Sequence, residues 1–394
     1  MDHLNGKTGA SGPLKVMTIF GTRPEAVKMA PLVKELESRP EFESYCCVTA
    51  QHRQMLDGVL SIFDLHPQFD LDIMEQRQTL STITSKCLVG LEQVFEQVRP
   101  DLVLVHGDTS TTFAGALAAF YQRIAIGHVE AGLRTYDKYS PFPEEMNRSM
   151  VGRLADLHFC PTESNRRNLE AEGIRSGIYV TGNTVIDALK TTVVKDYHFT
   201  TEILNQLDYE HKKVIVVTCH RRENYGQPME NIMAALRDIA RTHNDVELVY
   251  PVHLSPVVQE CAHRHLDGTD NIHLIEPLMA DEMHNLMARS YMVMTDSGGL
   301  QEEAPALGKP VLVLRRETER PEAVAAGTVK LAGVAYDDIV RLADQLIGDP
   351  DAYAAMARAV NPYGDGRACR RIADAILYYF GRTDRQPDLF SAEG

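Results

Sequence analysis

Acidic and basic residues gather in three short polar segments, each of which directly follows a run of apolar residues. The segments are GTRPE at Gly21–Glu25, HGDTSTT at His106–Thr112 and HVEAGLRTYDKYSPF at His128–Phe142, the last leading into a pair of glutamates. A hydrophobic core does not need this much charge, and α/β proteins place binding and catalytic groups in long loops at strand ends. Carboxylates combined with arginine predict proton transfer next to a bound anion.

Four carboxylates are the acid–base candidates: Asp108, Glu130, Glu144 and Glu145. Each lies just past a predicted strand, so several can share one pocket and push their pKa values apart, as acid–base work at neutral pH requires. The alternative for Asp108 and Glu144 is helix N-capping.

The segment TDSGGLQEE is the strongest phosphate-binding signal. A strand is expected to end at its threonine and a helix to begin near Leu300, so the free N–H groups at Ser297, Gly298 and Gly299 would face an anion. Glu302 and Glu303 are expected in the first helical turn, where one of them can reach ribose hydroxyls. The alternative is a tight turn that needs glycine for its geometry alone. The segment is neither a Walker loop nor a GxGxxG fingerprint, so ATP and NAD are weakly supported.

Three cations stand where they can meet the same kind of ligand. Arg23 and Lys28 lie one helical turn apart in TRPEAVKMAP, and Arg320 precedes a proline at a predicted helix start. Solvated charges on a helix are the competing explanation. His220, in CHRRENYG, is the leading imidazole candidate because Arg221 beside it raises the local positive potential.

The remaining histidines and the cysteines are expected to be structural. His106, His128, His158 and His253 are expected in the core or in supporting positions, and no pair of them has zinc spacing. The seven cysteines show no metal or disulfide spacing, so we expect reduced, mostly buried thiols and no metal site.

Short β-branched runs alternate with amphipathic stretches along the chain. The expected strands are 15–20, 45–50, 102–106, 124–129, 157–161 and 178–182, then 214–219, 246–252, 272–275, 291–295 and 310–314. Continuous apolar runs indicate strands buried on both faces, and therefore parallel doubly wound sheets. The predicted fold is α/β with two Rossmann-like domains. The ligand is expected at the carboxyl ends of the strands of both domains.

The expected domain boundaries follow from the same alternation of strands and helices. They are a tail at 1–14, a first domain at 15–194, a polar linker at 195–213, a nucleotide-binding domain at 214–366 and a C-terminal helix and tail at 367–394 that could pack back on the first domain.

Composition limits the partners of the chain. Its 394 residues carry a formal net charge of −15, which argues against nucleic acid as a partner. No signal peptide or transmembrane run is visible, so a cytoplasmic location without membrane partners is expected.

A dozen ordered motifs from Lys15 to Phe380 resemble the non-hydrolysing UDP-N-acetylglucosamine 2-epimerases of bacteria. They are GTRPEAVKMAPL, TAQHRQML, HGDTSTT, GHVEAGLRT, PFPEEMNR, TGNTVIDAL, HRRENYG, YPVH, TDSGGLQEEAP, GKPVLVLR, TERPEA and NPYGDG. The resemblance implies the glycosyltransferase-B type of fold, a homodimer, and interconversion of UDP-GlcNAc and UDP-ManNAc without a cofactor.

The resemblance also implies roles for residues at matching positions. Asp108, Glu130, Glu144 and His220 correspond to the acid–base and leaving-group set, and the substrate contacts would be Arg23, Lys28, Asp108, Glu130, His220, Ser297, Gly298, Gly299, Glu303 and Arg320. Some members bind a second UDP-GlcNAc as an activator, and the matching positions are Gln51, Gln54, Arg77, Glu144, Arg221 and His253. Two departures are Cys219, where glycine is usual, and the segment 277–283, which lacks aromatic residues.

Two other functions share part of this pattern. A glycosyltransferase of the same fold would recognise a UDP-sugar in a similar way, but it would need fewer acids than surround Glu130 and Glu144. A hydrolysing epimerase would let water add to the glucal intermediate and release free ManNAc.

Overall fold

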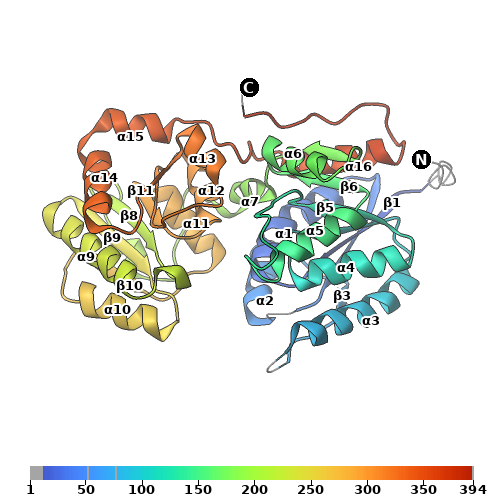
Figure 1. Cartoon of the computed structure of the whole chain (residues 1–394), viewed down its shortest axis with the longest axis horizontal. Coiled ribbons are helices and arrows are strands. Elements are labelled where there is room, and N and C mark those ends of the chain that lie inside the picture. Colours follow the sequence, from blue (N-terminus) through green and yellow to red (C-terminus); the bar gives the residue numbers. More distant parts are fainter. Residues whose placement is uncertain (1–11, 51–52, 76–77, 393–394) are drawn as a thin grey trace. The chain divides into compact units, whose positions relative to one another are not determined.

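The computed structural model describes residues 12–50, 53–75 and 78–392, which form two compact units (Figure 1). The first unit contains the chain up to Thr191 and from Tyr363 onward, and the second is Thr192–Pro362. The stretch 195–213, expected as a linker, packs within the second unit. There Tyr197 donates a 2.5 Å hydrogen bond to Asp281, and the backbone N–H of Thr201 donates one of 3.0 Å to Glu282.

The first unit alternates strands and helices as the apolar runs predict. Its elements are β1 (Leu14–Phe20), α1 (Arg23–Glu37), β2 (Phe42–Val48), α2 (Arg53–Ile62), β3 (Phe69–Asp70), α3 (Leu80–Val98), β4 (Leu102–His106), α4 (Ser110–Tyr121), β5 (Ala125–Val129), α5 (Glu144–Leu154), β6 (Leu157–Cys160), α6 (Glu163–Ala171), β7 (Ile178–Val180), α7 (Thr184–Thr192) and the C-terminal α16 (Ala368–Tyr379).

The second unit repeats the alternation. Its elements are α8 (Ile203–Gln206), β8 (Lys213–Thr218), the 3₁₀ turn η1 (Arg222–Asn224), α9 (Gln227–Thr242), β9 (Val246–Pro251), α10 (Pro256–Leu266), β10 (Ile272–Ile275), α11 (Ala280–Arg289), β11 (Met292–Thr295), α12 (Leu300–Ala306), β12 (Val311–Val313), α13 (Pro321–Ala326), β13 (Val329–Leu331), α14 (Tyr336–Gly348) and α15 (Pro350–Ala357).

Both sheets are parallel, and each has one point where the strand order reverses. The orders are β3-β2-β1-β4-β5-β6-β7 and β10-β9-β8-β11-β12-β13. The reversal falls between β1 and β4 in the first unit and between β8 and β11 in the second, and open α/β sheets bind ligands at the carboxyl ends of such strands. The predicted α/β class with two Rossmann-like sheets is confirmed.

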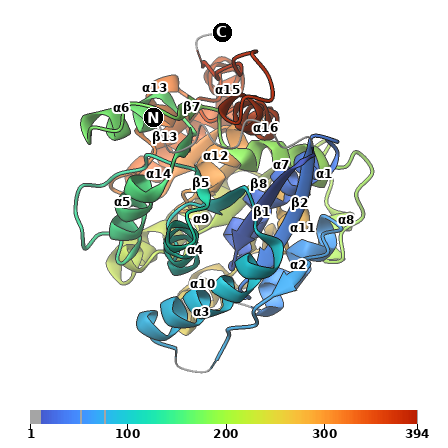
Figure 2. The same ribbon diagram turned by 90° about the vertical axis from the view of Figure 1, so that its right-hand side faces the viewer.

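Helices cover both faces of each sheet. Figure 2 shows α1 and α2 on one side of β1 and β2, with α3 and α4 on the other. On the latter side Ile19 and Val105, which pair in register, pack against Leu91 and Phe95 of α3. Burial on both faces explains why these strands are continuous apolar runs.

The C-terminal helix α16 belongs to the first unit. The carboxylate of Asp187 accepts hydrogen bonds from the backbone N–H groups of Ala368 at 3.1 Å and Cys369 at 3.0 Å. Arg39, two residues after the end of α1, pairs with Asp374 at 2.6 Å. These contacts fix both the start and the middle of the helix.

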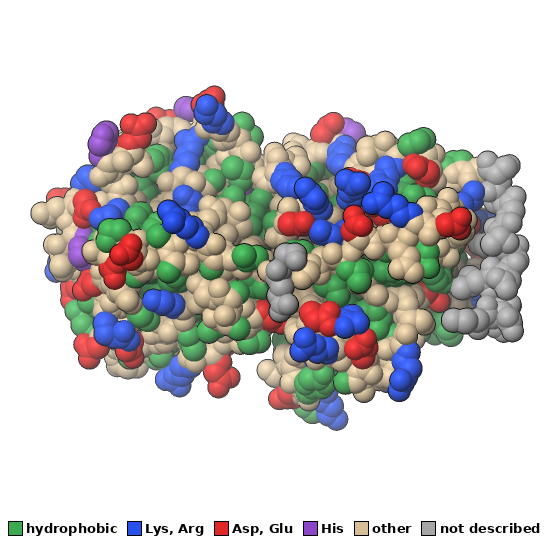
Figure 3. Space-filling model, turned by 90° about the horizontal axis from the view of Figure 1, so that it is seen from above, with side chains coloured by type: hydrophobic (Ala, Val, Ile, Leu, Met, Phe, Trp, Pro, Cys, Tyr) green, Lys and Arg blue, Asp and Glu red, His purple; other side chains and the backbone are tan. Residues whose placement is uncertain are grey.

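Surface charge is mixed in sign on the face that Figure 3 displays, where Lys and Arg side chains are intermingled with Asp and Glu. Within the described ranges, no helix is both long enough and apolar enough to cross a membrane. All seven cysteines are free and buried, as the sequence predicts.

Candidate active site

In the first unit, Glu25 joins the loops that follow β1 and β4. Its Oε2 accepts hydrogen bonds from the N–H groups of Gly21 (3.1 Å) and Thr22 (2.8 Å) and from the Thr22 hydroxyl (2.8 Å). Its Oε1 accepts hydrogen bonds from the hydroxyls of Thr109 (2.7 Å) and Thr112 (3.1 Å). Burial raises the pKa of Glu25 despite these donors. One buried side chain therefore fixes the mutual position of the two loops at the point where the strand order reverses.

Glu130, directly after β5, is the centre of a second cluster. Lys28 forms an ion pair with its Oε1, and Asn183 donates a 3.0 Å hydrogen bond to the same oxygen. His106 Nε2 lies 3.7 Å from its Oε2. Glu130 has a φ of 62°, a left-handed conformation that costs a residue with a side chain about 1–3 kcal/mol. The structure thus brings together Glu130 and Lys28, which the sequence singled out separately.

The buried histidines of the first unit are neutral supporting groups. Burial lowers the pKa of His106 to about 4, and neither of its ring nitrogens has a hydrogen-bond partner among the described residues. The pKa of His128 falls to about 3, again chiefly through burial, while its Nε2 bonds to the Gly107 carbonyl at 2.7 Å. His158 is buried as well. The structural interpretation of these three histidines is confirmed.

Asp108 has the most perturbed carboxylate of this edge. Burial is the main cause that raises its pKa to about 7, Glu130 and Glu144 add to the rise, and Arg148 opposes it. The Arg148 Nε lies 3.4 Å from the carboxylate, and Asn147 donates a 2.9 Å hydrogen bond to the Asp108 carbonyl. Asp108 can therefore exchange a proton near neutral pH.

The capping alternative is wrong for Asp108. Thr109 is the N-cap of α4, and its hydroxyl accepts the N–H of Thr112 at 3.1 Å. Glu144 is the first residue of α5, where the helix dipole favours a negative charge. Glu145 is buried. Its carboxylate accepts hydrogen bonds from the backbone N–H groups of Thr135 and Tyr136, each at 3.0 Å, and thereby holds the long loop in place.

Arg23 stands at the first position of α1 and is half-buried. It lies in the loop that Glu25 fixes, one turn before Lys28. The helix N-terminus and both cations thus belong to one rigid segment, which is the arrangement that an anionic ligand requires.

In the second unit, Asp296 organises the loop that carries His220. Its side chain is fully buried, and its Oδ2 accepts hydrogen bonds from the N–H groups of His220 (2.8 Å) and Arg221 (2.7 Å) and from the Asn224 amide (3.1 Å). Its Oδ1 finds no hydrogen-bond donor within the described part of the chain and lies 3.5 Å from His220 Nδ1. Asp296 connects the ends of β8 and β11, the strands on either side of the reversal.

His220 stacks on a second histidine. Its ring centroid lies 5.3 Å from that of His253, and the two planes are 17° apart. Burial is the main cause that lowers the pKa of His220, His253 and Arg221 lower it further, and Asp296 raises it. His253 is exposed, so of the two expected placements it takes the supporting one beside His220 and not the core one.

Two guanidinium groups surround the glycines that follow β11. A Cβ placed on Gly298 would lie 3.6 Å from Arg320 Nη2 and 3.8 Å from Arg221 Nη2. Arg320 also forms an ion pair with the buried Glu302. Because Gly298 has no side chain, a ligand can approach the backbone N–H groups there closely. The two guanidinium groups add positive charge, and phosphate binding uses both kinds of donor.

Three further predicted positions can be placed. Ser297 follows Asp296, and its N–H donates a 2.9 Å hydrogen bond to the Thr295 hydroxyl, so the expectation that this N–H is free for an anion is wrong. A Cβ on Gly299 would meet Glu303 Oε1 at 3.2 Å. The other Glu303 oxygen lies 3.4 Å from His284 Nε2. The helix predicted near Leu300 is confirmed as α12.

Cys219, which stands where glycine is usual, does not need the conformational freedom of glycine. Its backbone lies outside the left-handed region, its side chain is buried in the core, and its carbonyl accepts a 2.6 Å hydrogen bond from Tyr250. The other departure, 277–283, leads into α11, whose first turn carries Asp281 and Glu282.

The residues matched to an activator site are described only in part. Gln51 and Arg77 lie outside the described residues, as does the side chain of Gln54, whose backbone belongs to α2. Glu144 begins α5, and Arg221 and His253 flank His220.

Three supporting residues could not be singled out from the sequence: Asn183, Arg148 and Asp296. They lie inside the quoted motifs TGNTVIDAL, PFPEEMNR and TDSGG. Arg148 and Asp296 are polar residues close to Glu144 and Ser297 in the sequence, which was the available signal, whereas Asn183 has no predicted site residue beside it.

The chain is similar to known proteins over most of its length. The sequence model of the family described as UDP-N-acetylglucosamine 2-epimerase matches residues 34–377. The UDP-N-acetylglucosamine 2-epimerase of Bacillus subtilis is 58% identical over 381 residues, covering 96% of this chain and 99% of its own. The UDP-N-acetylglucosamine 2-epimerase of Escherichia coli K12 is 53% identical over 369 residues, which cover 92% of this chain and 98% of its own.

A solved structure extends the likeness to the fold. The UDP-GlcNAc 2-epimerase from Neisseria meningitidis, bound to UDP-GlcNAc, superposes with a TM-score of 0.84 at 48% identity and covers 92% of this chain and 100% of its own. Similar epimerase structures confirm the predicted glycosyltransferase-B type of fold.

Proposed function

Because the chain belongs to the UDP-N-acetylglucosamine 2-epimerase family, we propose that it interconverts UDP-GlcNAc and UDP-ManNAc by a non-hydrolysing route. UDP is eliminated to give a glucal and then re-added after reprotonation of carbon 2. The observation that carries the proposal is the cluster of Asp108, Glu130 and Glu144, in which one carboxyl has its pKa raised to about 7.

The chemistry explains why leaving-group stabilisation must accompany the acids. The carbon-2 proton is hardly acidic, so cleavage of the bond between carbon 1 and UDP must build oxocarbenium character before the proton is lost. Arg23, Arg320 and the N–H groups of Gly298 and Gly299 stabilise the departing diphosphate electrostatically. The positive charge around Gly298 supports this assignment.

The carboxylates move the proton. One takes the carbon-2 proton as the bond to UDP breaks, and the electron pair of the C–H bond forms the double bond of the glucal. A second acid then protonates the opposite face of carbon 2 while UDP attacks carbon 1 again. Asp108, Glu130 and Glu144 supply these groups, and His220 assists the leaving group.

Lys28 and Glu303 have supporting roles in the same reaction. Lys28 pairs with Glu130 and holds it for the reaction, and Glu303 takes the ribose hydroxyls. No step needs oxidation, a metal ion or a dinucleotide. We further propose a homodimer as the active form and UDP-GlcNAc as an activator that contacts Arg221 and His253.

Reaction in D₂O tests the mechanism. With UDP-GlcNAc as substrate, NMR should show deuterium at carbon 2 of both epimers and no free ManNAc, without added metal or NAD. Epimer formed without deuterium would exclude proton exchange at carbon 2. Accumulating ManNAc would indicate the hydrolysing alternative, and transfer of the sugar to an acceptor would indicate a glycosyltransferase.

A further inference from the structure

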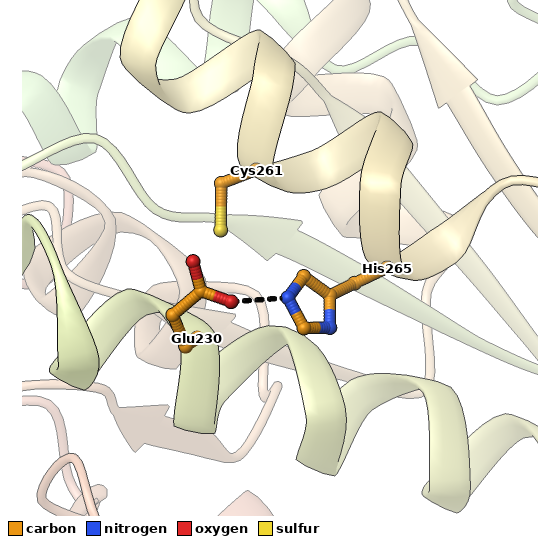
Figure 4. Close-up of side chains that lie close together, drawn as sticks. All are labelled: Glu230, Cys261 and His265. Carbon is orange, nitrogen blue, oxygen red and sulfur yellow. Dashed lines mark hydrogen bonds and ion pairs between the residues drawn. The ribbon is translucent and has the colours of Figure 1, made fainter.

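A cluster of three metal-ligand side chains lies on α9 and α10, outside the loops that carry the proposed active-site residues. Glu230 comes from α9, and Cys261 and His265 come from α10. Figure 4 shows the three side chains turned toward one another. A carboxylate oxygen, the thiol sulfur and a ring nitrogen all lie within 4.8 Å of one another.

Helix geometry explains how the chain forms this cluster. Cys261 and His265 are four residues apart, so they lie on one face of α10, as paired metal ligands on a helix do. The neighbouring helix α9 supplies Glu230 opposite them. A search of the sequence for cysteine pairs or histidine pairs overlooks this site because each ligand is of a different type.

The present contacts show that the ligands already face a common point. The Glu230 carboxylate bonds to His265 Nε2 with one oxygen and to Arg264 with the other. The Arg264 side chain is 59% exposed, so it can turn into solvent when a cation replaces it. Glu230 is 34% exposed, which gives an ion access to the otherwise buried Cys261.

We propose that Glu230, Cys261 and His265 bind one thiophilic divalent cation of the zinc class, independently of the epimerase reaction. Tetrahedral Zn²⁺ holds sulfur, nitrogen and oxygen ligands about 3.3–3.8 Å from one another, a spacing that side-chain rotation reaches from the present positions. Three protein ligands leave a fourth position for water. Binding expels the thiol proton, so affinity rises with pH, and the cation ties α9 to α10.

Cobalt(II) is the direct probe, because a cobalt–thiolate bond produces a charge-transfer absorption in the near ultraviolet. Full-length protein without a histidine tag, stripped by a chelator, is titrated with Co²⁺ under anaerobic conditions. We expect one thiolate-bound Co²⁺ per chain, displaced by Zn²⁺. Cys261→Ser should abolish the charge-transfer band, and Glu230→Gln or His265→Gln should weaken binding at least about 10-fold.

Two variants of α10 serve as controls. His263→Gln changes an exposed histidine of the same helix that bonds to Asp267 instead, and it should leave Co²⁺ binding unchanged. Arg264→Ala removes the competing cation and should tighten binding. Absence of the band in the wild-type protein, or an unchanged band in Cys261→Ser, would overturn the proposal, provided that circular dichroism and metal-free thermal unfolding show folded variants.

Discussion

The Asp296 carboxylate accepts the backbone N–H of His220 at 2.8 Å, and its other oxygen lies 3.5 Å from the Nδ1 of the same histidine. One fully buried side chain thus controls both the backbone and the ring of the leading imidazole candidate. The two residues lie 76 positions apart in the sequence, and they meet because β8 and β11 are neighbours in the sheet. Asp296 therefore positions His220 without needing to touch the substrate.

Asp296→Asn should lower turnover more than it raises KM. The amide replaces an oxygen that accepts three hydrogen bonds, and a disturbed buried hydrogen bond costs about 1–3 kcal/mol, which corresponds to roughly 5- to 160-fold in rate. Because Asp296 raises the pKa of His220, the histidine limb of the pH–rate profile should also move to lower pH.

Asp156→Asn is the matched control for that variant. Its carboxylate accepts the N–H of Ile126 at 2.9 Å in the first unit, so it tests the loss of a similar bond away from His220. Equal pH–rate profiles for Asp296→Asn and the wild-type enzyme would assign Asp296 a purely structural role.

The pH dependence of kcat/KM should contain an ionisation near pH 7 that belongs to Asp108, whose pKa is raised to about 7. Arg148 is the cation that opposes this rise, so Arg148→Met should move the ionisation to higher pH by roughly one unit. Arg153→Met, on the same helix but bonded to the Glu172 carbonyl, should not. An ionisation near pH 7 that persists in Asp108→Asn would show that it belongs to another group.

The raised pKa of Asp108 also predicts a more stable but less active variant. A carboxyl with a raised pKa destabilises the folded state fully above pH 7, and this penalty disappears as the pH falls through 7 toward 3.8, the ordinary pKa of an aspartate. The full shift is equivalent to about 4 kcal/mol. Asp108→Asn should raise the free energy of unfolding at pH 8 by only about 1–2 kcal/mol, because the Asp108 side chain is 28% exposed and solvent screens part of the penalty.

Urea unfolding at pH 8 and pH 4 measures this effect. The gain should be present at the higher pH and should fade at the lower one, while turnover at pH 7 falls about 10²- to 10⁴-fold. A variant that is less stable at pH 8 would mean that the ion pair outweighs the burial of the charge.

The sequence predicted the long strands of both sheets but not the two short edge strands. The pair Phe69–Asp70 is too short for any periodicity, and in Val329–Leu331 only the valine is buried. The loops that carry Asp108, Glu130 and His220 were predictable because buried parallel strands must end in loops at a common edge. Neither apolar periodicity nor residue type indicated how these loops are held.

Supporting contacts were harder to predict because they depend on which strands are neighbours. Nothing in the local sequence of Asn183 indicates a bond to Glu130, 53 residues away. Glu25 likewise resembles an ordinary acid in the first turn of a helix, although it accepts bonds from two loops. Such partners follow from the strand order, which the alternation of elements leaves open.

The stack of His253 on His220 predicts how an activator would act. A ligand that contacts His253 would act on the ring that stacks on the proposed catalytic histidine, so UDP-GlcNAc bound there should favour one His220 position over others. The wild-type enzyme should show sigmoidal rates with UDP-GlcNAc and a lag with UDP-ManNAc alone. His253→Ala should give hyperbolic rates, whereas His243→Ala, whose ring bonds to Asp344, should not. If the rates of His253→Ala stay sigmoidal, the activator binds elsewhere. If the wild-type rates are hyperbolic and show no lag, UDP-GlcNAc is not an activator, and the proposed epimerase reaction is unaffected.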